Sequence, residues 1–213
     1  MNVIELHFPV LGGSLPVDHG YTLYGALSRI VPALHIDDSP VSIGPIRGDY
    51  AGNGTLHLGP HSVLRLRLPT GLVPQLLPLA GKPLELDGHR LRLGVPQIHA
   101  LLPAPNLFAR IVTIKVSGIA NPSAEQFLDA VRRRLEESEI HGEPHLPVVA
   151  SGPHAGQPRR RVLSLKNRHL VGFAVILAGL SPEASLGLQS DSPFSRRRMG
   201  CGFFVPVEET ERD

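Results

Sequence analysis

The order of strands and helices along the chain predicts an α+β protein, built from two consecutive halves that share the order βαββαβ. Segments in which apolar residues alternate indicate strands, and segments in which they recur at helical spacing indicate helices. With 22 Gly and 21 Pro among 213 residues, turns are frequent and the elements between them are short. Two such halves in tandem are typical of two ferredoxin-like domains.

The first half is expected to contain four strands and two helices. The strands are predicted at residues 3–9, 41–47, 62–68 and 84–93, the last as a strand pair or one bent strand. In residues 64–68 leucine alternates with arginine, so the leucines share one face of a sheet. The first helix should begin near His19 and end just before Pro32, and a second helix, weakened by two prolines, is expected at residues 71–80.

The second half repeats this order after the stiff segment Leu-Pro-Ala-Pro-Asn at residues 102–106. This segment is the predicted boundary between a domain at 1–103 and a domain at 107–213. Strands are expected at residues 107–115, 161–166, 169–177 and 199–206, with a polar loop at 141–158. Ser123 and Gln126 have the spacing of a capping box that opens a helix, and Ser181 precedes a proline at the first position of another.

The composition is that of an ordinary globular protein, with 42% hydrophobic and 19% charged residues. The sequence contains no apolar run long enough to span a bilayer and no secretory signal. A single cysteine, Cys201, fits a reducing compartment, so we expect a cytoplasmic protein without a membrane partner. The sequence has no Walker loop, Rossmann fingerprint or Gly-x-Ser-x-Gly elbow.

Arginine occurs in triplets at residues 132–134, 159–161 and 196–198, although the formal net charge is only +2. A planar guanidinium suits phosphate, but glutamates follow the first triplet, so helical ion pairs are its expected use. The last triplet precedes Gly200 and Gly202, and glycine lets a backbone approach a phosphate closely. A solvated basic turn that enters the final strand would explain the same residues.

Four segments of the chain resemble CRISPR-associated repeat-processing endoribonucleases, members of the repeat-associated mysterious protein (RAMP) superfamily. The segment SRRRMGCGFFVP at residues 195–206 resembles their glycine-rich loop. The segments LPVDHGYTLYGALS at 15–28 and SIGPIRG at 42–48 resemble the first helix and the following strand of the myxococcal-type subgroup. The segments RRRVLSLK at 159–166 and VGF at 171–173 resemble the hairpin before the last helix, so the resemblance spans nearly the whole chain.

This resemblance implies two ferredoxin-like, or RRM-like, domains that bind the repeat of precursor CRISPR RNA and cleave it to mature crRNA without a metal. The ribose 2'-hydroxyl attacks the adjacent phosphate and leaves a 2',3'-cyclic phosphate and a 5'-hydroxyl. Subunits of a type I effector complex are possible further partners. A non-catalytic crRNA-binding subunit of such a complex is the alternative reading, and a ferredoxin-like domain for a small ligand or protein is the third.

The resemblance also implies a catalytic histidine in or just after the first helix. A histidine suits this role because imidazole can transfer protons near neutral pH. Of the eleven histidines, His35 is favoured and His19 is the second choice. Several relatives have the histidine inside the helix, where this chain has Tyr24 or Ser28. Tyr24 or Tyr21 is expected to orient the 2'-hydroxyl, with helix packing as the alternative use of both. Lys166 in the hairpin is expected to stabilise the charge that develops on the phosphate.

Contacts to RNA phosphates are expected from the second and third arginine triplets, the hairpin and the glycine-rich loop. The predicted RNA-binding residues are Arg159, Arg160, Arg161, Arg168, Arg196, Arg197, Arg198, Gly200 and Gly202. Aromatic residues make up only 5% of the chain, which favours phosphate contacts over base stacking as the main mode of recognition. No cofactor or metal is expected, because no carboxylate or cysteine cluster completes the two His-x-x-x-His pairs.

Overall fold

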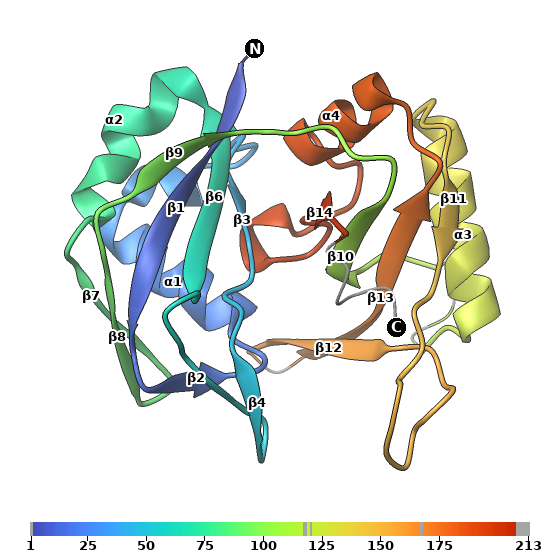
Figure 1. Ribbon diagram of the computed structural model, residues 1–213, viewed down its shortest axis with the longest axis horizontal. Helices are drawn as coiled ribbons and strands as arrows, with labels where there is room; N and C mark the ends of the chain where they lie inside the picture. The colour runs from blue at the N-terminus through green and yellow to red at the C-terminus, as the bar shows by residue number, and fades with distance from the viewer. Residues whose placement is uncertain (1, 117–118, 120, 167, 208–213) are drawn as a thin grey trace. The chain divides into compact units, whose positions relative to one another are not determined.

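The computed structural model of the protein describes residues 2–116, 119, 121–166 and 168–207. It is an α+β structure that divides into two compact units (Figure 1). The first unit comprises Met1–Leu101 together with Arg198–Gly200, and the second comprises Leu102–Arg197 and the chain from Cys201 onward. No helix among the described residues combines the length and the apolar character that crossing a bilayer requires.

The first unit has a ferredoxin-like sheet with an additional small sheet. Its strands are β1 (Val3–Gly12), β2 (Ser14–Pro16), β3 (Ser42–Ile43), β4 (Asp49–Gly52), β5 (Thr55–His57), β6 (Val63–Pro69), β7 (Pro83–Leu86), β8 (His89–Leu93) and β9 (Gln97–Ala100). Its helices are α1 (Gly20–Ile30), α2 (Val73–Leu76) and the 3₁₀ turns η1 (Pro32–His35), η2 (Thr70–Leu72) and η3 (Leu77–Leu79).

The strand order of the larger sheet is β3-β6-β1-β8-β7, and β2-β5-β4 form the smaller one. The fourth strand of the ferredoxin-like pattern is divided, because β9 pairs with Ile4–His7 of β1 whereas β8 pairs with Val10–Gly12. Alternate side chains of β1 and β6, such as Leu6 and Leu66, are fully buried in a core that also contains Leu27 of α1. The leucine-arginine alternation of β6 therefore gives a strand with one face in the core, as predicted.

Two features of the first unit differ from the sequence prediction. The helix expected at residues 71–80 is the interrupted series η2, α2 and η3, because prolines lie at the first turns of α2 and η3. The strands β2, β4, β5 and β9 were not predicted. The hairpin of β4 and β5 turns at Asn53 and Gly54, both with positive φ, and Asn-Gly is a strong hairpin signal that the prediction passed over.

The second unit has its own antiparallel sheet of five strands, four of which are adjacent in one continuous order. Its elements are β10 (Leu107–Val112), α3 (Ala124–Glu137), β11 (Glu143–His145), β12 (Arg160–Leu165), β13 (Arg168–Ala178), α4 (Pro182–Ser190), η4 (Arg197–Met199) and β14 (Val205–Pro206). The strand order is β11-β13-β10-β14, and β12 pairs with β13 off this path. Figure 1 shows α3 beside the sheet, and the buried side chains of Phe127 and Leu188 place α3 and α4 in one core with Leu107 and Val175.

Both predicted helix starts in this unit are confirmed. Ser123 Oγ accepts a hydrogen bond from the backbone N–H of Gln126 at 3.2 Å, and Gln126 Oε1 accepts one from the N–H of Ser123 at 3.0 Å. Ser181 Oγ accepts a hydrogen bond from the N–H of Ala184 at 3.2 Å, and Pro182 takes the first helical position. Local side-chain chemistry thus determines where α3 and α4 begin.

The hairpin predicted from residues 161–166 and 169–177 is confirmed, because β12 pairs with β13 antiparallel. Two other predictions in this unit were wrong. The segment expected to be a polar loop contains β11, which lies on the path β11-β13-β10-β14, whereas β12 pairs with β13 off this path. The strand expected at residues 199–206 is reduced to Val205–Pro206, because Gly200 and Gly202 have φ of 82° and 62° and interrupt extended backbone. Asn167, at the predicted hairpin turn, lies outside the described residues.

Candidate active site

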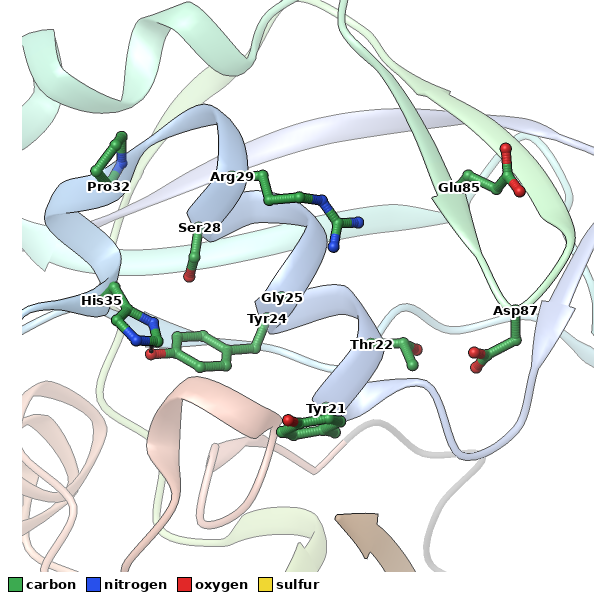
Figure 2. Close-up of a pocket in the computed structure, with 10 residues that line it drawn as sticks. All are labelled: Tyr21, Thr22, Tyr24, Gly25, Ser28, Arg29, Pro32, His35, Glu85 and Asp87. Carbon is green, nitrogen blue, oxygen red and sulfur yellow. Dashed lines mark hydrogen bonds between the residues drawn. The ribbon is translucent and has the colours of Figure 1, made fainter. Parts of the chain in front are cut away.

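A tyrosine-histidine pair in the first unit forms the centre of the candidate site. Tyr24 Oη lies 3.0 Å from His35 Nδ1, a hydrogen-bonding distance, and the two rings are nearly parallel, with 5.8 Å between their centroids. Figure 2 shows Tyr24 projecting from α1 toward His35, which ends η1. Tyr24 is buried whereas His35 is exposed, so the pair combines a fixed phenol with an imidazole that solvent or a ligand can reach.

Pro32 is the reason that His35 returns to the helix that precedes it. The α-helix ends at Ile30, and Val31 has φ −124° and ψ 87°, which is outside the helical region. Pro32 then opens a single 3₁₀ turn with its N-terminal φ preset. The chain reverses over this turn and brings His35 beside Tyr24, eleven positions earlier in the sequence.

Arg198 holds the backbone on both sides of this histidine. Its Nη1 donates hydrogen bonds to the carbonyl oxygen of Leu34 at 3.0 Å and to that of Ile36 at 2.7 Å. The guanidinium carbon also lies 5.4 Å from the centroid of the Tyr24 ring. Arg198 belongs to the first unit, as Met199 and Gly200 do, although Arg197 belongs to the second. Its contacts fix the position of both members of the pair.

The Tyr24–His35 hydrogen bond prepares the imidazole for proton transfer at its other nitrogen. When the neutral ring donates its Nδ1–H to Tyr24 Oη, Nε2 has a free lone pair and can act as a base. When the ring is protonated on both nitrogens, Nδ1–H makes the same hydrogen bond and the Nε2–H of the imidazolium can act as an acid. The arrangement therefore supports general acid or base chemistry at His35 Nε2.

A pocket with a volume of about 600 Å³ opens beside the pair. Its lining consists of one face of α1, the turn after it and the β7–β8 hairpin, namely Tyr21, Thr22, Tyr24, Gly25, Ser28, Arg29, Pro32, His35, Glu85 and Asp87 (Figure 2). Ser28 Oγ is buried in this lining and has no hydrogen-bond partner among the described residues. Sequence analysis did not identify the contribution of the hairpin.

His19, the second choice for the catalytic histidine, has a structural position. It is only 1% exposed, and its Nδ1–H donates to the carbonyl oxygen of Pro16 at 2.7 Å. Its Nε2 accepts a hydrogen bond from the backbone N–H of Ile46 at 3.1 Å. Both ring nitrogens are therefore occupied within the fold, which leaves neither for a substrate.

Lys166 and the second arginine triplet lie in the second unit, on and around β12. Lys166 and Arg168 are exposed at the turn between β12 and β13. Arg159 Nε donates to the carbonyl oxygen of Val148 at 2.7 Å, whereas Arg160 is exposed. Burial and the neighbouring positive charge of Arg159 lower the pKa of Arg161. The roles assigned to these residues in RNA binding and charge stabilisation stay predictions.

The three arginines of the last triplet have different surroundings. Arg196 is exposed, and its Nη1 donates to the neighbouring Ser195 Oγ at 2.9 Å. Arg197 forms an ion pair with the carboxylate of Asp191, and Arg198 supports the Tyr24–His35 pair. The sequence analysis expected all three to contact phosphates. Of the three, Arg196 is the exposed one, and the hydrogen bond described for its guanidinium is to Ser195.

Gly200 and Gly202 both have positive φ, a conformation that favours glycine. A side chain at Gly202 would place its Cβ 2.9 Å from Phe194 Cβ and 3.0 Å from Ser192 Oγ. The backbone N–H of Gly202 donates to the carbonyl oxygen of Ile111 at 2.8 Å. The fold alone thus requires glycine at position 202. Their proposed contact with RNA stays a prediction.

Within the described part of the chain, no group of three or more His, Cys, Asp and Glu side chains could hold a metal ion. The candidate site contains the phenol of Tyr24, the imidazole of His35, the guanidinium of Arg198 and the lining of the adjacent pocket.

The family model described as Cas6 Crispr matches residues 4–209 of the chain. The chain belongs to the Cas6 family. The CRISPR-associated endonuclease Cas6 of Myxococcus xanthus (strain DK1622) is 41% identical over 212 residues, which cover 100% of this chain and 85% of that protein. The resemblance inferred from the sequence segments is thereby confirmed.

Solved structures of Cas6 and RAMP proteins have the same fold as this Cas6 family member. A CRISPR-associated protein Cas6 aligns with a TM-score of 0.66 at 13% identity and covers 97% of this chain and 99% of that chain. A RAMP protein described as binding different RNA substrates aligns with a TM-score of 0.62 at 16% identity, covering 98% and 100%. A Cas6-related protein from Pyrococcus furiosus aligns with a TM-score of 0.65 at 12% identity, covering 97% and 99%.

Proposed function

We propose that this Cas6 family member is an endoribonuclease that binds the repeat of precursor CRISPR RNA and cuts it to mature crRNA. The observation that supports cutting, rather than binding alone, is the Tyr24–His35 hydrogen bond at 3.0 Å beside an open pocket. Membership of the Cas6 family and 41% identity to a protein named as an endonuclease support the same conclusion.

The proposed reaction is an attack of a ribose 2'-hydroxyl on the adjacent phosphorus. The 2'-oxygen forms a bond to phosphorus, the bond from phosphorus to the 5'-oxygen breaks, and the products are a 2',3'-cyclic phosphate and a 5'-hydroxyl. One proton must leave the 2'-oxygen and one must reach the departing 5'-oxygen. His35 is exposed and its Nε2 suits one of these transfers, while Tyr24 holds the ring through Nδ1.

The negative charge that develops on the phosphate needs a cation or hydrogen-bond donors. Lys166 is proposed for this role because it is an exposed ammonium at the β12–β13 turn, with Arg168 two positions later. In this proposal the cations of the chain supply the stabilisation, so cleavage should persist in EDTA.

The RNA backbone is proposed to follow the basic residues of the second unit. Arg160 and Arg168 are exposed, and Arg159 and Arg161 flank the start of β12. Arg196 adds an exposed guanidinium before the glycine-rich loop. Neutralised phosphates release counterions, so this binding should weaken steeply with salt. Further subunits of an effector complex and a cytoplasmic location belong to the same proposal.

Single-turnover cleavage of a repeat RNA in EDTA, followed by end-group analysis, tests the function. His35→Ala should reduce the rate at least about a hundredfold, since general acid-base groups contribute about 10²–10⁴. Tyr24→Phe retains the ring but removes the hydrogen bond to Nδ1, so it should also slow cleavage while repeat affinity is preserved.

His19→Gln is the matched control, because it changes a histidine outside the pocket and should leave the rate of the folded protein near that of wild type. A wild-type protein that binds its repeat tightly but never cleaves it would favour the binding-subunit alternative. Products with a 3'-hydroxyl end would contradict the 2'-hydroxyl mechanism.

A further inference from the structure

We propose that the pocket beside the Tyr24–His35 pair binds one unpaired guanine base next to the scissile phosphate, recognised by Arg29, Glu85 and Asp87. This inference rests on the proposed function. The volume of about 600 Å³ lies in the range of about 300–1,000 Å³ that is usual for small-ligand sites. Proton transfer at His35 uses only one end of this space.

The far end of the pocket is formed by the β7–β8 hairpin, and its charge excludes the RNA backbone. Glu85 and Asp87 line it from the hairpin, and both are exposed (Figure 2). An ionised carboxylate can only accept hydrogen bonds, and it repels a phosphate group. This end of the pocket therefore suits a part of the RNA that carries N–H donors and no charge, which is the base.

None of the three charged groups of the pocket is neutralised within the described residues. Arg29, Glu85 and Asp87 take part in no ion pair or side-chain hydrogen bond there. Arg90 lies directly opposite Glu85 across the hairpin, yet the described residues form no ion pair between them. The hydrogen-bonding capacity of all three side chains is thus available to a ligand.

Guanine matches this combination of groups better than the other bases do. Its N1–H and N2–H₂ are adjacent donors that one carboxylate can accept together, whereas the other bases offer a carboxylate a single donor group. Its O6 and N7 are the acceptors that an arginine fork contacts. Arg29 on α1 faces the hairpin in Figure 2, so donors and acceptors approach the pocket from opposite walls.

The walls of the pocket supply two further features that a base can use. Tyr21 presents its ring at the pocket, and unpaired RNA bases stack on aromatic side chains. Ser28 Oγ is buried without a partner among the described residues, and a ligand in the pocket could satisfy it. Because His35 must reach the reacting oxygens, the base belongs to one of the two nucleotides that flank the scissile phosphate.

The turn itself offers a competing explanation for Asp87. Asp87 and Gly88 have φ of 50° and 84°, and Asp-Gly is favoured in hairpin turns of this kind. Asn suits the same turn, so Asp87→Asn preserves the hairpin while it removes the charge. Glu85→Gln likewise removes a charge and preserves the strand β7. Asp49→Asn is the control, because Asp49 is an exposed carboxylate of this unit that does not line the pocket.

The experiment measures single-turnover cleavage of repeats that carry each of the four bases at each flanking nucleotide. Wild type and Asp49→Asn should prefer guanine at one of them by roughly 5- to 150-fold, the discrimination expected of a good bidentate contact. The variant with both Glu85→Gln and Asp87→Asn should lose most of that ratio. A general gain in RNA affinity from lost negative charge would leave the ratio unchanged.

Inosine in place of guanine tests the same contact in the wild-type protein, because it lacks only the N2 amino group, and it should reduce the rate. Equal cleavage of all bases, a preference for another base, or a full guanine preference in the double variant would overturn the inference and leave the proposed function standing. Absence of cleavage on every repeat would instead contradict the proposed function.

Discussion

The guanidinium of Arg198 lies over the ring of Tyr24, with 5.4 Å between its central carbon and the ring centroid. The same guanidinium donates hydrogen bonds to the carbonyl oxygens on both sides of His35. A single side chain, far from both residues in the sequence, thus fixes the positions of the phenol and the imidazole relative to each other. Arg198 acts through these residues and is therefore a positioning residue.

Arg198→Lys should slow cleavage while RNA affinity changes little. Lysine retains the charge but cannot donate to both carbonyls with a planar fork. Hydrogen bonds to charged groups contribute about 1.5–3 kcal/mol, so a loss of roughly tenfold or more in single-turnover rate is expected. The matched variant Arg197→Lys changes an arginine that pairs with Asp191 instead.

The pH profile of cleavage separates positioning from phosphate binding in these two variants. If Arg198 orients His35, Arg198→Lys should alter the profile as well as the rate, whereas Arg197→Lys should alter neither. A loss of RNA affinity in Arg198→Lys at unchanged cleavage rate would show that Arg198 contacts RNA and does not position the pair.

Sequence patterns correctly predicted those helices and strands that depend on residues close together in the sequence. The capping box of Ser123 and the alternation in β6 each fix an element within a few residues, and both predictions were right. The strand β11 has only three residues, Glu143–His145, and no apolar alternation. It forms because β13 offers an edge for it to pair with, which is a non-local cause that periodicity does not record.

The candidate site shows the same division between local and distant causes. Tyr24 and His35 lie on one helix and the turn after it, so the sequence could bring them together. The contacts of Arg198 join positions 164 and 162 residues apart. The burial of His19 depends on the backbone N–H of Ile46, and the pocket lining of Glu85 depends on packing of the β7–β8 hairpin. No spacing rule gives these relationships.

Arg196→Ala should weaken repeat binding and flatten its salt dependence, because Arg196 is exposed with a guanidinium that pairs with no carboxylate among the described residues. Loss of one phosphate contact should lower the slope of log affinity against log salt by roughly 0.7–0.9. Titrations at several salt concentrations measure this slope. Arg132→Ala is the control, because Arg132 pairs with Asp129 on α3. Equal slopes for wild type and Arg196→Ala would remove Arg196 from the RNA interface.

Protonation of Glu5 should make the protein less stable at low pH than at neutral pH. Arg67 Nε donates to Glu5 Oε1 at 2.7 Å, and His7 Nε2 lies 2.5 Å from Oε2. Burial raises the pKa of Glu5, but the hydrogen bond from His7 and the charge of Arg67 outweigh it and lower the pKa from 4.5 to about 2. A depressed folded-state pKa contributes stability above pH 4.5, and this contribution, about 3 kcal/mol, is lost as the pH falls toward 2.

Urea unfolding between pH 2 and pH 7 measures this effect. Glu5→Gln should lower the unfolding midpoint at neutral pH, because Arg67 is 2% exposed and loses the carboxylate that neutralises it. It should also flatten the decline in stability below pH 4.5. Asp49→Asn should keep the wild-type pH dependence. The same steep decline in Glu5→Gln would assign the acid sensitivity to other groups.

Gly200→Ala and Gly202→Ala should differ in stability although both glycines have positive φ. The backbone conformation alone costs an alanine about 1–2 kcal/mol at either position. A Cβ at Gly200 would meet its nearest neighbour, Pro45, at 3.7 Å, which is an ordinary contact. At Gly202 it would meet Phe194 Cβ at 2.9 Å, so the packing must shift at a further cost of about 1–3 kcal/mol. Urea unfolding followed by circular dichroism should therefore rank Gly202→Ala below Gly200→Ala, and equal losses would contradict the packing argument. Because Gly200→Ala is the milder change, it is also the better probe of RNA contact. Reduced repeat affinity of the folded variant would place this loop against the RNA backbone, whereas unchanged affinity would assign Gly200 to the fold alone.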